Sequence, residues 1–550
     1  MPERRLESWK EIAVYLNRGV RTVRRWETDE GLPVHRLAHR KQGTVFAYPS
    51  ELDSWRESRR VDRNGTNSGT RSPRAPSRRT MIAVLPFTDL GGTAEYLANG
   101  LLEEMISYLG RLSPSALGVI ARTTMMSYRA DGRSLRKIAD ELKVDYVVEG
   151  SVRRDKHRVR VTARLIDASD QTDLWSNTYD ETLRSILVLQ RNLAMDIATG
   201  IRPTLAARLH ERRSGADRVD SSAYEAHLEG RSLLTRFTPD TVRQSIHAFQ
   251  RAITADPAYA PAYASLAEAH QQLSVWTEVP PSSALPMALE AARHALRLDS
   301  DLPDAHASLG LINATYLWKW DEAEKSFRRA LELNPGCSSA GQWYGEFLAA
   351  MGRFDDAARI IDAALAHDPM SPAILATKTF VLWMGRRFDE AIDQAEAVLD
   401  IDPAYPMALI RLGVAYVGKG DWAPAIRAFR RAVSAAPELP ACYGLLGYAY
   451  GRADNRLQAL AALEKLAQLQ ENRYVPALPF GMVHLGLGEM ETAIRYMERE
   501  YQNRGWSVLL LNQAPQFDPL RGMPRFDAIV RRLRFPASPA VDRSLREEQT

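Results

Sequence analysis

Proline recurs at a constant interval in the second half of the chain. Four prolines lie 34 residues apart: Pro335, Pro369, Pro403 and Pro437. An alanine precedes each of them by 12 positions: Ala323, Ala357, Ala391 and Ala425. A small residue lets two helices pack closely, and a proline ends a helix because it lacks the backbone N–H. The period therefore predicts a stack of helical hairpins in which each repeat buries its apolar surface against its neighbours.

The phrases that end on these prolines are "ALELNP", "ALAHDP", "VLDIDP" and "AVSAAP". They resemble the tetratricopeptide repeat, which has a period of 34 residues. Weaker copies continue outward, from "AFQRAITADP" to "GMVHLGLGEMETAIRYM". We expect about eight repeats over 222–505, a C-terminal cap over 506–535 and a tail over 536–550. The resemblance implies that the repeats bind a protein or peptide partner.

In tetratricopeptide arrays the first helix of each repeat lines the inner face. Counting from the prolines places five apolar or aromatic residues on that side: Phe380, Trp383, Val414, Val417 and Tyr448. Two interpretations stay open. These residues are inter-helix core in a tightly wound superhelix, or they line a hydrophobic peptide groove. The apolar segment 506–535 is a candidate to fill such a groove, because the end of a solenoid needs covering.

Charge is distributed unevenly along the chain. Residues 1–80 contain 18 Lys and Arg against 10 Asp and Glu, whereas the remaining 470 contain 54 against 58. A basic N-terminal part on a mildly acidic body indicates a polyanionic partner for the N-terminal part. The segment 59–79 is rich in Gly, Ser, Pro and Arg, so it cannot bury a core. We expect a flexible basic linker there, behind a separate domain at 1–58.

Two short amphipathic segments lie before this linker. Ser8 stands three residues before Glu11, which is the spacing of a capping box, so we expect a helix to begin at Trp9. The apolar face of this helix consists of Ile12, Ala13 and Leu16. Gly19 then suits a turn that needs unusual backbone angles.

In the second segment, apolar residues recur every three positions and are expected to face inward: Val20, Val23 and Trp26. The polar residues between them face outward: Arg21, Thr22, Arg24 and Arg25. This pattern predicts a helix-turn-helix with a basic second helix. Two strands joined by a basic turn at 39–43 follow, and then a helix capped by Ser50, which together is the pattern of a wing.

Residues 6–58 resemble the winged helix-turn-helix of the MerR and excisionase families, in "IAVYLNRGVRTVRRWE" and "FAYPSELDSW". The resemblance implies binding to double-stranded DNA, with the second helix in the major groove. Arg21, Arg24 and Arg25 would then face the groove, and Thr22 would contact a phosphate. The wing would contribute Arg36, Arg40 and Lys41. One small module usually binds DNA weakly, so self-association into a homo-oligomer is implied as well.

Between the linker and the repeats, residues 80–210 read as an α/β domain. We expect strands at 81–87, 117–121, 145–154, 158–167 and 172–180, and helices at 94–112, 134–142 and 183–209. The phrases "IAVLPFTDLGG", "YVVEGSVRR" and "RVRVTARLIDASD" resemble the FlgO-like and TolB amino-terminal-like domains. Such domains occur in bacterial regulators, which frequently carry a transmembrane helix before the sensory part. The charged linker here contains none, so we expect a cytoplasmic protein without a membrane partner.

No residue set argues for catalysis, so we expect no enzyme, no cofactor and no metal. Glu103 and Glu104 are adjacent on a helix and point about 100° apart, a poor acid–base pair. A hairpin turn explains the cluster of Asp167, Asp170 and Asp173, whose spacing does not fit a calcium loop. The only two cysteines, Cys337 and Cys442, suit neither a disulfide framework nor a zinc site.

The sequence thus predicts a multidomain protein with a small winged helix-turn-helix, an α/β middle domain and an all-α tetratricopeptide solenoid. Three functions compete. The first is a cytoplasmic DNA-binding transcriptional regulator whose repeats bind a protein. The second is a protein-interaction scaffold whose N-terminal module does not act on DNA. The third is an unrecognised enzyme centred on the α/β domain.

Overall fold

The structure is a computed structural model that falls into two compact units, Met1–Ser77 and Arg78–Thr550. It describes residues 5–6, 8–16, 20, 23–24, 26–27, 32–37, 44–52, 79–91, 95–128, 134–155, 158–182, 185–201, 219–235, 238–275 and 279–536. The predicted linker at 59–79 lies outside these ranges except for its last residue.

The N-terminal unit forms its own small core. Helix α1 (Trp9–Tyr15) begins where the sequence predicts, and the Ser8 hydroxyl accepts a hydrogen bond from the backbone nitrogen of Glu11 at 3.2 Å. Strands β1 (His35–Leu37) and β2 (Thr44–Phe46) pair in the antiparallel sense. Seven buried side chains make the core: Ile12, Ala13, Leu16, Val23, Leu32, Ala47 and Leu52.

The inward side of the predicted second helix is confirmed. Val23 is fully buried, and Val20 and Trp26 pack against the same core. The described residues of this segment are helical, which agrees with the spacing of three that placed these side chains on one face. The turn at 17–19 and the basic turn at 39–43 lie outside the described residues, so the winged helix-turn-helix itself stays a prediction.

The predicted cap at Ser50 is wrong. The helical turn after β2 begins at Pro49, and the backbone nitrogen of Leu52 donates to the carbonyl of Tyr48 at 3.1 Å. Proline suits the first helical position because its missing N–H would have no partner there. Ser50 therefore lies inside the turn, where its side chain is exposed.

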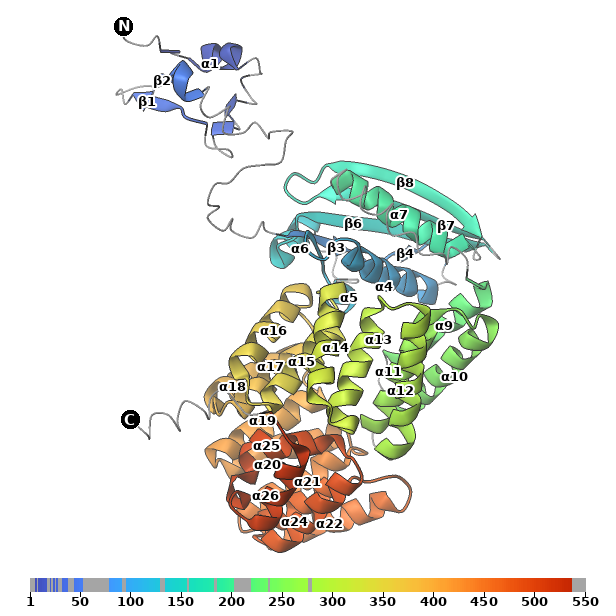
Figure 1. The fold of residues 1–550 in the computed structure, drawn as a ribbon, viewed down its shortest axis with the longest axis vertical. Coiled ribbons are helices and arrows are strands. Elements are labelled where there is room, and N and C mark those ends of the chain that lie inside the picture. The colour runs from blue at the N-terminus through green and yellow to red at the C-terminus, as the bar shows by residue number, and fades with distance from the viewer. Residues whose placement is uncertain are drawn as a thin grey trace. The chain divides into compact units, whose positions relative to one another are not determined.

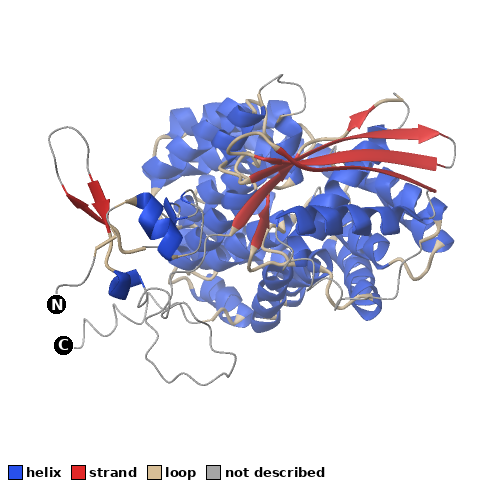
Figure 2. Ribbon diagram, turned by 90° about the horizontal axis from the view of Figure 1, so that it is seen from above, coloured by secondary structure: helices blue, strands red, loops and turns tan. Residues whose placement is uncertain are grey.

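The second unit begins with a mixed sheet in the order β5-β3-β6-β7-β8, with β4 beside β6. The strands are β3 (Thr80–Val84), β4 (Thr88–Asp89), β5 (Leu117–Val119), β6 (Tyr146–Asp155), β7 (Arg158–Asp167) and β8 (Asp173–Thr182). Strands β3, β4 and β5 run parallel to their neighbours, whereas β6, β7 and β8 form an antiparallel meander. Figure 2 shows these strands in red.

Helices cover the two faces of the sheet unequally. On the inner face, α4 (Glu95–Leu112) and α7 (Ile186–Ile201) pack against alternate residues of the long strands, such as Val161. On the outer face, α5 (Arg122–Ser127) and α6 (Leu135–Leu142) pack against a smaller cluster centred on β3 and the start of β6. The outward residues of β6, β7 and β8 beyond that cluster are polar and largely exposed.

The predicted elements of this region are confirmed with shifts at their ends, except that residues 202–209 of the helix predicted over 183–209 lie outside the described residues and that β4 was not predicted. Strand β7 spans the predicted residues, because apolar and polar side chains alternate along it from Arg158 to Leu165. The Asp167 and Asp170 carboxylates accept hydrogen bonds from Ser169 and Thr172 within the tight turn that follows, as the hairpin interpretation requires. Helix α5 was not predicted, since six residues are too few to show a helical period.

The described helices that follow pair into eight successive helical hairpins. Figure 1 shows how these hairpins stack. Their helices are α9 (Ser221–Leu234), α10 (Pro239–Ala255), α11 (Ala260–Val275), α12 (Pro281–Leu298), α13 (Pro303–Ile312), α14 (Trp320–Leu333), α15 (Ser338–Ala350), α16 (Phe354–His367), α17 (Pro372–Met384), α18 (Phe388–Ile401), α19 (Pro406–Lys419), α20 (Trp422–Ala435), α21 (Pro440–Arg452), α22 (Arg456–Gln470), α23 (Ala477–Gly486) and α24 (Met490–Gln502). A short π-helix, η2 (Asn313–Leu317), extends α13.

The 34-residue pattern accounts for how these hairpins are built. Helices α14, α16, α18 and α20 each end two residues before one of the periodic prolines. The four periodic alanines are fully buried, as close helix packing requires. Gly413 serves the same purpose, because a side chain there would collide with the ring of Phe429 on the paired helix.

The segment after the last hairpin folds back onto the repeats. It consists of η3 (Trp506–Leu509), α25 (Leu510–Gln513), η4 (Pro515–Leu520) and α26 (Pro524–Leu533). The Asn512 side chain donates to the carbonyl of Ala350 at 2.9 Å, and the Trp320 indole donates to the carbonyl of Leu533 at 3.0 Å. Among the described helices, none combines the length and the apolar character that crossing a membrane requires.

Candidate functional sites

The predicted DNA-contacting residues fall mostly outside the described part of the chain. Arg24 is described; its side chain is exposed, and its guanidinium carbon lies 5.3 Å from the centre of the Trp9 ring. The backbone of Arg36 pairs with Val45 in the β1–β2 hairpin. Five predicted contacts lie outside the described residues: Arg21, Thr22, Arg25, Arg40 and Lys41. The small N-terminal core therefore carries both Arg24 and the hairpin that contains Arg36.

The predicted groove residues of the repeats are mostly buried. Phe380, Trp383, Val414 and Tyr448 are at most 5% exposed, and Val417 is half-buried. All of them belong to or pack against one large apolar cluster. That cluster also contains buried side chains of the C-terminal segment: Leu511, Phe517, Leu520, Phe526, Ile529 and Leu533. The groove residues and the C-terminal segment thus share one core.

A buried arginine in the repeats was missed by the sequence interpretation. The Arg411 guanidinium lies 4.1 Å from the centre of the Phe380 ring and 3.6 Å from the Glu346 carboxylate, and it is 7% exposed. Burial lowers the pKa of Arg411, and burial raises the pKa of Glu346. An arginine within the apolar run "PMALIRLGVAY" was the signal that could have identified it.

A charged cluster joins the α/β region to the first repeats. Arg231 on α9 donates to Glu103 on α4 at 2.8 Å and to Glu268 on α11 at 2.7 Å. Burial alone would lower the pKa of Arg231, but the charges of Glu103 and Glu268 raise it well above its usual value. Burial, and next the charge of Glu103, raises the pKa of Glu104 to about 7. Glu103 and Glu104, the adjacent pair noted in the sequence, therefore lie at the internal interface between the α/β region and the first repeats.

A second junction connects the loop between β5 and α5 with the loop after α16. The backbone nitrogen of Ala121 donates to the carbonyl of His367 at 2.7 Å, and the His367 ring lies 3.1 Å from the carbonyl of Val119. Asp368 accepts hydrogen bonds from Thr124. Two separated repeats thus hold the α/β region, and local sequence patterns give no sign of such distant partners.

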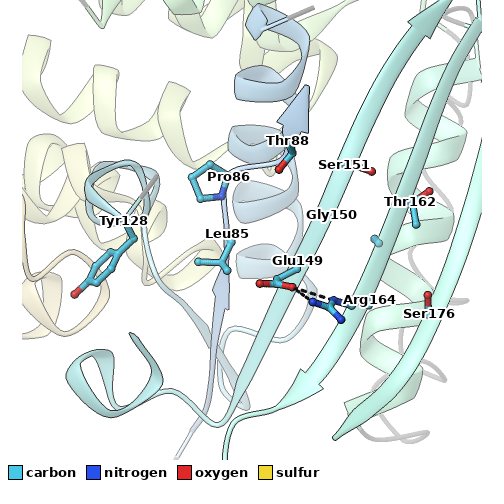
Figure 3. A pocket seen from close by; sticks show the side chains of 11 residues that line it. Leu85, Pro86, Thr88, Tyr128, Glu149, Gly150, Ser151, Thr162, Arg164 and Ser176 are labelled. Carbon is cyan, nitrogen blue, oxygen red and sulfur yellow. Dashed lines mark hydrogen bonds and ion pairs between the residues drawn. The ribbon is translucent and has the colours of Figure 1, made fainter. Parts of the chain in front are cut away.

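The outer face of the sheet contains a pocket of about 380 Å³ between α5 and the long strands. Figure 3 shows Glu149 and Arg164 joined across β6 and β7, with Leu85 and Pro86 beside them and Tyr128 farther out. Arg164 Nε donates to the Glu149 carboxylate at 2.9 Å, and this hydrogen bond raises the pKa of Arg164. Cys337 and Cys442 are buried thiols in the repeats, away from this pocket's lining.

Comparison with known proteins identifies two of the regions. Residues 78–195 match the family model of the HilA/YgeH-like transcriptional regulator, second domain. Residues 319–379 and 381–440 match tetratricopeptide repeat models. The chain therefore contains a HilA/YgeH-like regulator domain followed by tetratricopeptide repeats. Two resemblances remain predictions: that of the α/β domain to FlgO-like and TolB amino-terminal-like domains, and that of 6–58 to MerR and excisionase modules.

Two curated relatives match longer stretches. "Putative adenylate cyclase 3" of Rhizobium meliloti is 33% identical over 256 residues, which are 46% of this chain and 43% of that protein. "Transcriptional regulator HilA" of Salmonella typhimurium is 23% identical over 322 residues, 58% of this chain and 57% of that protein. The chain thus spans about half the length of these relatives. The solved human IFIT1 dimer with PPP-AAAA is 17% identical, covers 58% of this chain and 83% of its own, and has a TM-score of 0.40, too low to support an inference.

Proposed function

We propose that this protein is a cytoplasmic, DNA-binding transcriptional regulator whose N-terminal unit binds double-stranded DNA and whose repeats bind a protein partner. The observation that carries the proposal is the match of 78–195 to a transcriptional regulator domain, placed between a basic N-terminal part and the repeats. The proposal includes no catalytic step, no cofactor and no metal. Self-association is part of it, because a single small module binds DNA weakly.

On the DNA side, the proposed contacts are those of a basic helix and a wing. Arginine presents a fork of donors that suits both guanine edges and phosphates. Arg21, Arg24 and Arg25 would read the major groove, with Thr22 on a phosphate. Three further residues would contact the backbone from the wing: Arg36, Arg40 and Lys41. The exposed side chain of Arg24 supports this assignment.

On the protein side, the proposed partner site comprises the predicted groove residues on α17, α19 and α21. Four of these five side chains are buried in the core that they share with 506–535. Partner binding at this site would therefore require the C-terminal segment to move. The Arg386–Asp518 ion pair at 2.7 Å, between the end of α17 and η4, is one contact that would break.

The test is a selection of bound sites from random double-stranded DNA with the full chain, followed by gel-shift titration. Deletion of 1–58 should abolish binding, and replacing Arg40 and Lys41 by alanine should flatten the dependence of log K on log salt. The matched control replaces two exposed arginines of α20, Arg427 and Arg430. It should leave the DNA affinity and its salt dependence unchanged. Equal DNA affinity in the chain without 1–58 would refute the assignment of DNA binding to the N-terminal unit, and failure of the full chain to bind DNA would favour the scaffold alternative.

A further inference from the structure

A ladder of hydroxyl groups crosses the outer face of the sheet. Register places Thr88 opposite Ser151, Ser151 opposite Thr162, and Thr162 opposite Thr178 on four neighbouring strands. The hydroxyls of Thr162 and Thr178 are 3.2 Å apart. Residues directly opposite one another on one face stand side by side, so the ladder forms a continuous polar row. None of these hydroxyl residues belongs to the apolar cluster on the inner face or to the smaller one on the outer face.

The next row of the same face contains an ion pair. Glu149 is opposite Arg164, and Arg164 is opposite Ser176. Both hydrogen bonds from Arg164 go to one oxygen, Oε2, of Glu149. Among the described residues, no hydrogen bond reaches the other oxygen. The two rows together therefore offer hydroxyl groups, guanidinium donors and one carboxylate oxygen with spare hydrogen-bonding capacity.

Except for Thr178, the residues of these two rows line the pocket shown in Figure 3 and form its floor. Leu85, Pro86 and the ring of Tyr128 add apolar surface to its lining. A volume of about 380 Å³ lies within the range of pockets that hold small molecules. A pocket with a polar floor and apolar flanks suits a ligand that has hydroxyl groups on one side and C–H groups on another.

The charge of the lining limits what the pocket can accept. Among the described residues that line the pocket, only Glu149 and Arg164 are charged, and they form an ion pair with each other. Asp173 lies 3.7 Å from Arg164 outside the lining, so the guanidinium has carboxylates on two sides. A charged ligand would meet no unpaired counter-charge among the described lining residues of this partly desolvated site, which is unfavourable. A neutral polar ligand meets no such cost.

We propose that this pocket binds a neutral polyhydroxylated small molecule of the size of a mono- or disaccharide. The free oxygen of Glu149 accepts hydrogen bonds from adjacent ligand hydroxyls. Arg164 and the hydroxyls of Ser151 and Thr162 bind ligand oxygens, while the apolar flanks contact ring C–H groups. The pocket shares no residue with the proposed DNA and partner sites, and ligand binding there would make the regulator domain responsive to a small molecule.

The first experiment measures binding to the full chain by calorimetry and by saturation-transfer NMR. The probes are glucose and maltose, with glucuronate and glucosamine as charged counterparts of similar size. We expect a neutral sugar to bind and the charged ones to bind at least tenfold more weakly. Absence of binding by both neutral sugars, or equal binding of the charged ones, would overturn the proposal.

The second experiment changes the charge and the hydroxyls of the pocket. The double variant Ser151→Ala with Thr162→Ala should bind the neutral sugar at least tenfold more weakly. Thr182→Ala, on the same face outside the pocket, should bind it with unchanged affinity. Glu149→Gln should shift the preference toward glucuronate, and Arg164→Gln toward glucosamine. Circular dichroism confirms that each variant is folded. Unchanged affinity in the folded Ser151 and Thr162 double variant would refute the site.

Discussion

Asp368 of the repeats accepts two hydrogen bonds from Thr124 of the α/β region, at 3.1 Å from its backbone nitrogen and at 2.8 Å from its hydroxyl. Both residues are fully buried. The Thr124 hydroxyl in turn accepts a hydrogen bond from the backbone nitrogen of Met370 at 3.0 Å. Burial raises the pKa of Asp368, although the hydrogen bonds from Thr124 act against this. The buried carboxylate of Asp368 is tolerated because Thr124 supplies hydrogen-bond donors for it.

The first prediction concerns this junction. Thr124→Val preserves the shape of the side chain but removes the hydroxyl, so Asp368 loses a donor and Met370 loses an acceptor. The free energy of unfolding should fall by roughly 1–3 kcal/mol, the cost of leaving buried polar groups unpaired. Chemical denaturation measures the loss, and amide hydrogen exchange should rise at 120–127.

The repeat provides a matched control for this prediction. Asp402 stands 34 residues after Asp368, and its carboxylate accepts a local hydrogen bond from Ala404 at 3.1 Å. Asp402→Ala should therefore cost much less stability than Asp368→Ala and should leave exchange at 120–127 unchanged. Equal losses in the two variants would show that the contact with Thr124 contributes nothing beyond the local turn.

The second prediction concerns pH and the charged cluster on α4. The pKa of Glu104 is raised from 4.5 to about 7 in the folded chain, by burial and then by Glu103. At pH values between 4.5 and about 7, Glu104 keeps its proton in the folded chain, whereas the unfolded chain has already released it. Proton binding by Glu104 therefore stabilises the folded chain. This stabilisation is fully present below about pH 4.5 and is lost as the pH rises through about 7. The loss is at most about 3 kcal/mol, and less because the side chain keeps some contact with water.

Glu104→Gln keeps the side chain neutral at every pH, so it should remove this part of the pH dependence. The variant should exceed the parent in stability at pH 8 and approach it at pH 5, as denaturation at several pH values would measure. Glu464→Gln, on an exposed position of α22, serves as the control and should follow the parent. Parallel curves for the parent and the Glu104 variant would show that Glu104 titrates normally.

How far the sequence predicts this fold depends on the distance over which each signal acts. Strand β7 and the helices that end before the periodic prolines follow from patterns within one element, and the structure confirms them. The contact between Asp368 and Thr124 spans 244 positions, and no local pattern contains it. Glu103 shows the same limit. From the sequence, Glu103 and its neighbour Glu104 could only be judged a poor acid–base pair, because the ion-pair partner of Glu103, Arg231, lies 128 residues away.

The candidate sites divide in the same way. The outward positions of β6 and β7 follow from alternation, but the pocket above them also needs α5, which is too short to be predicted. Arg411 is buried because the ring of Phe380 and the Glu346 carboxylate from two other helices surround it. A sequence gives the identity of such a residue but not the neighbours that make its burial tolerable.

The third prediction rests on the proposed DNA-binding function. Arg24→Ala should weaken binding to the selected site by about 1–3 kcal/mol, the value of a base-reading contact. Arg24→Lys keeps the charge but loses the forked geometry, so its affinity should be intermediate and its base preference relaxed. Gel-shift titration measures both. Lys10→Ala, exposed on α1, is the control, and a loss as large as that of Arg24→Ala would indicate general electrostatic attraction only.

The last prediction separates the two interpretations of the inner face of the repeats. Trp383 and Tyr448 are 2% and 4% exposed, so replacing either by alanine leaves a cavity and should lower the free energy of unfolding by about 3–5 kcal/mol. Leu457→Ala, at a side chain that is 75% exposed, should change it by less than about 0.5 kcal/mol. Thermal melts followed by circular dichroism provide both values. Capture of protein partners, normalised to the folded fraction, then decides between the interpretations. A fall in capture is what a peptide groove requires, whereas unchanged capture would mean that these rings are core and that partners bind elsewhere on the repeats.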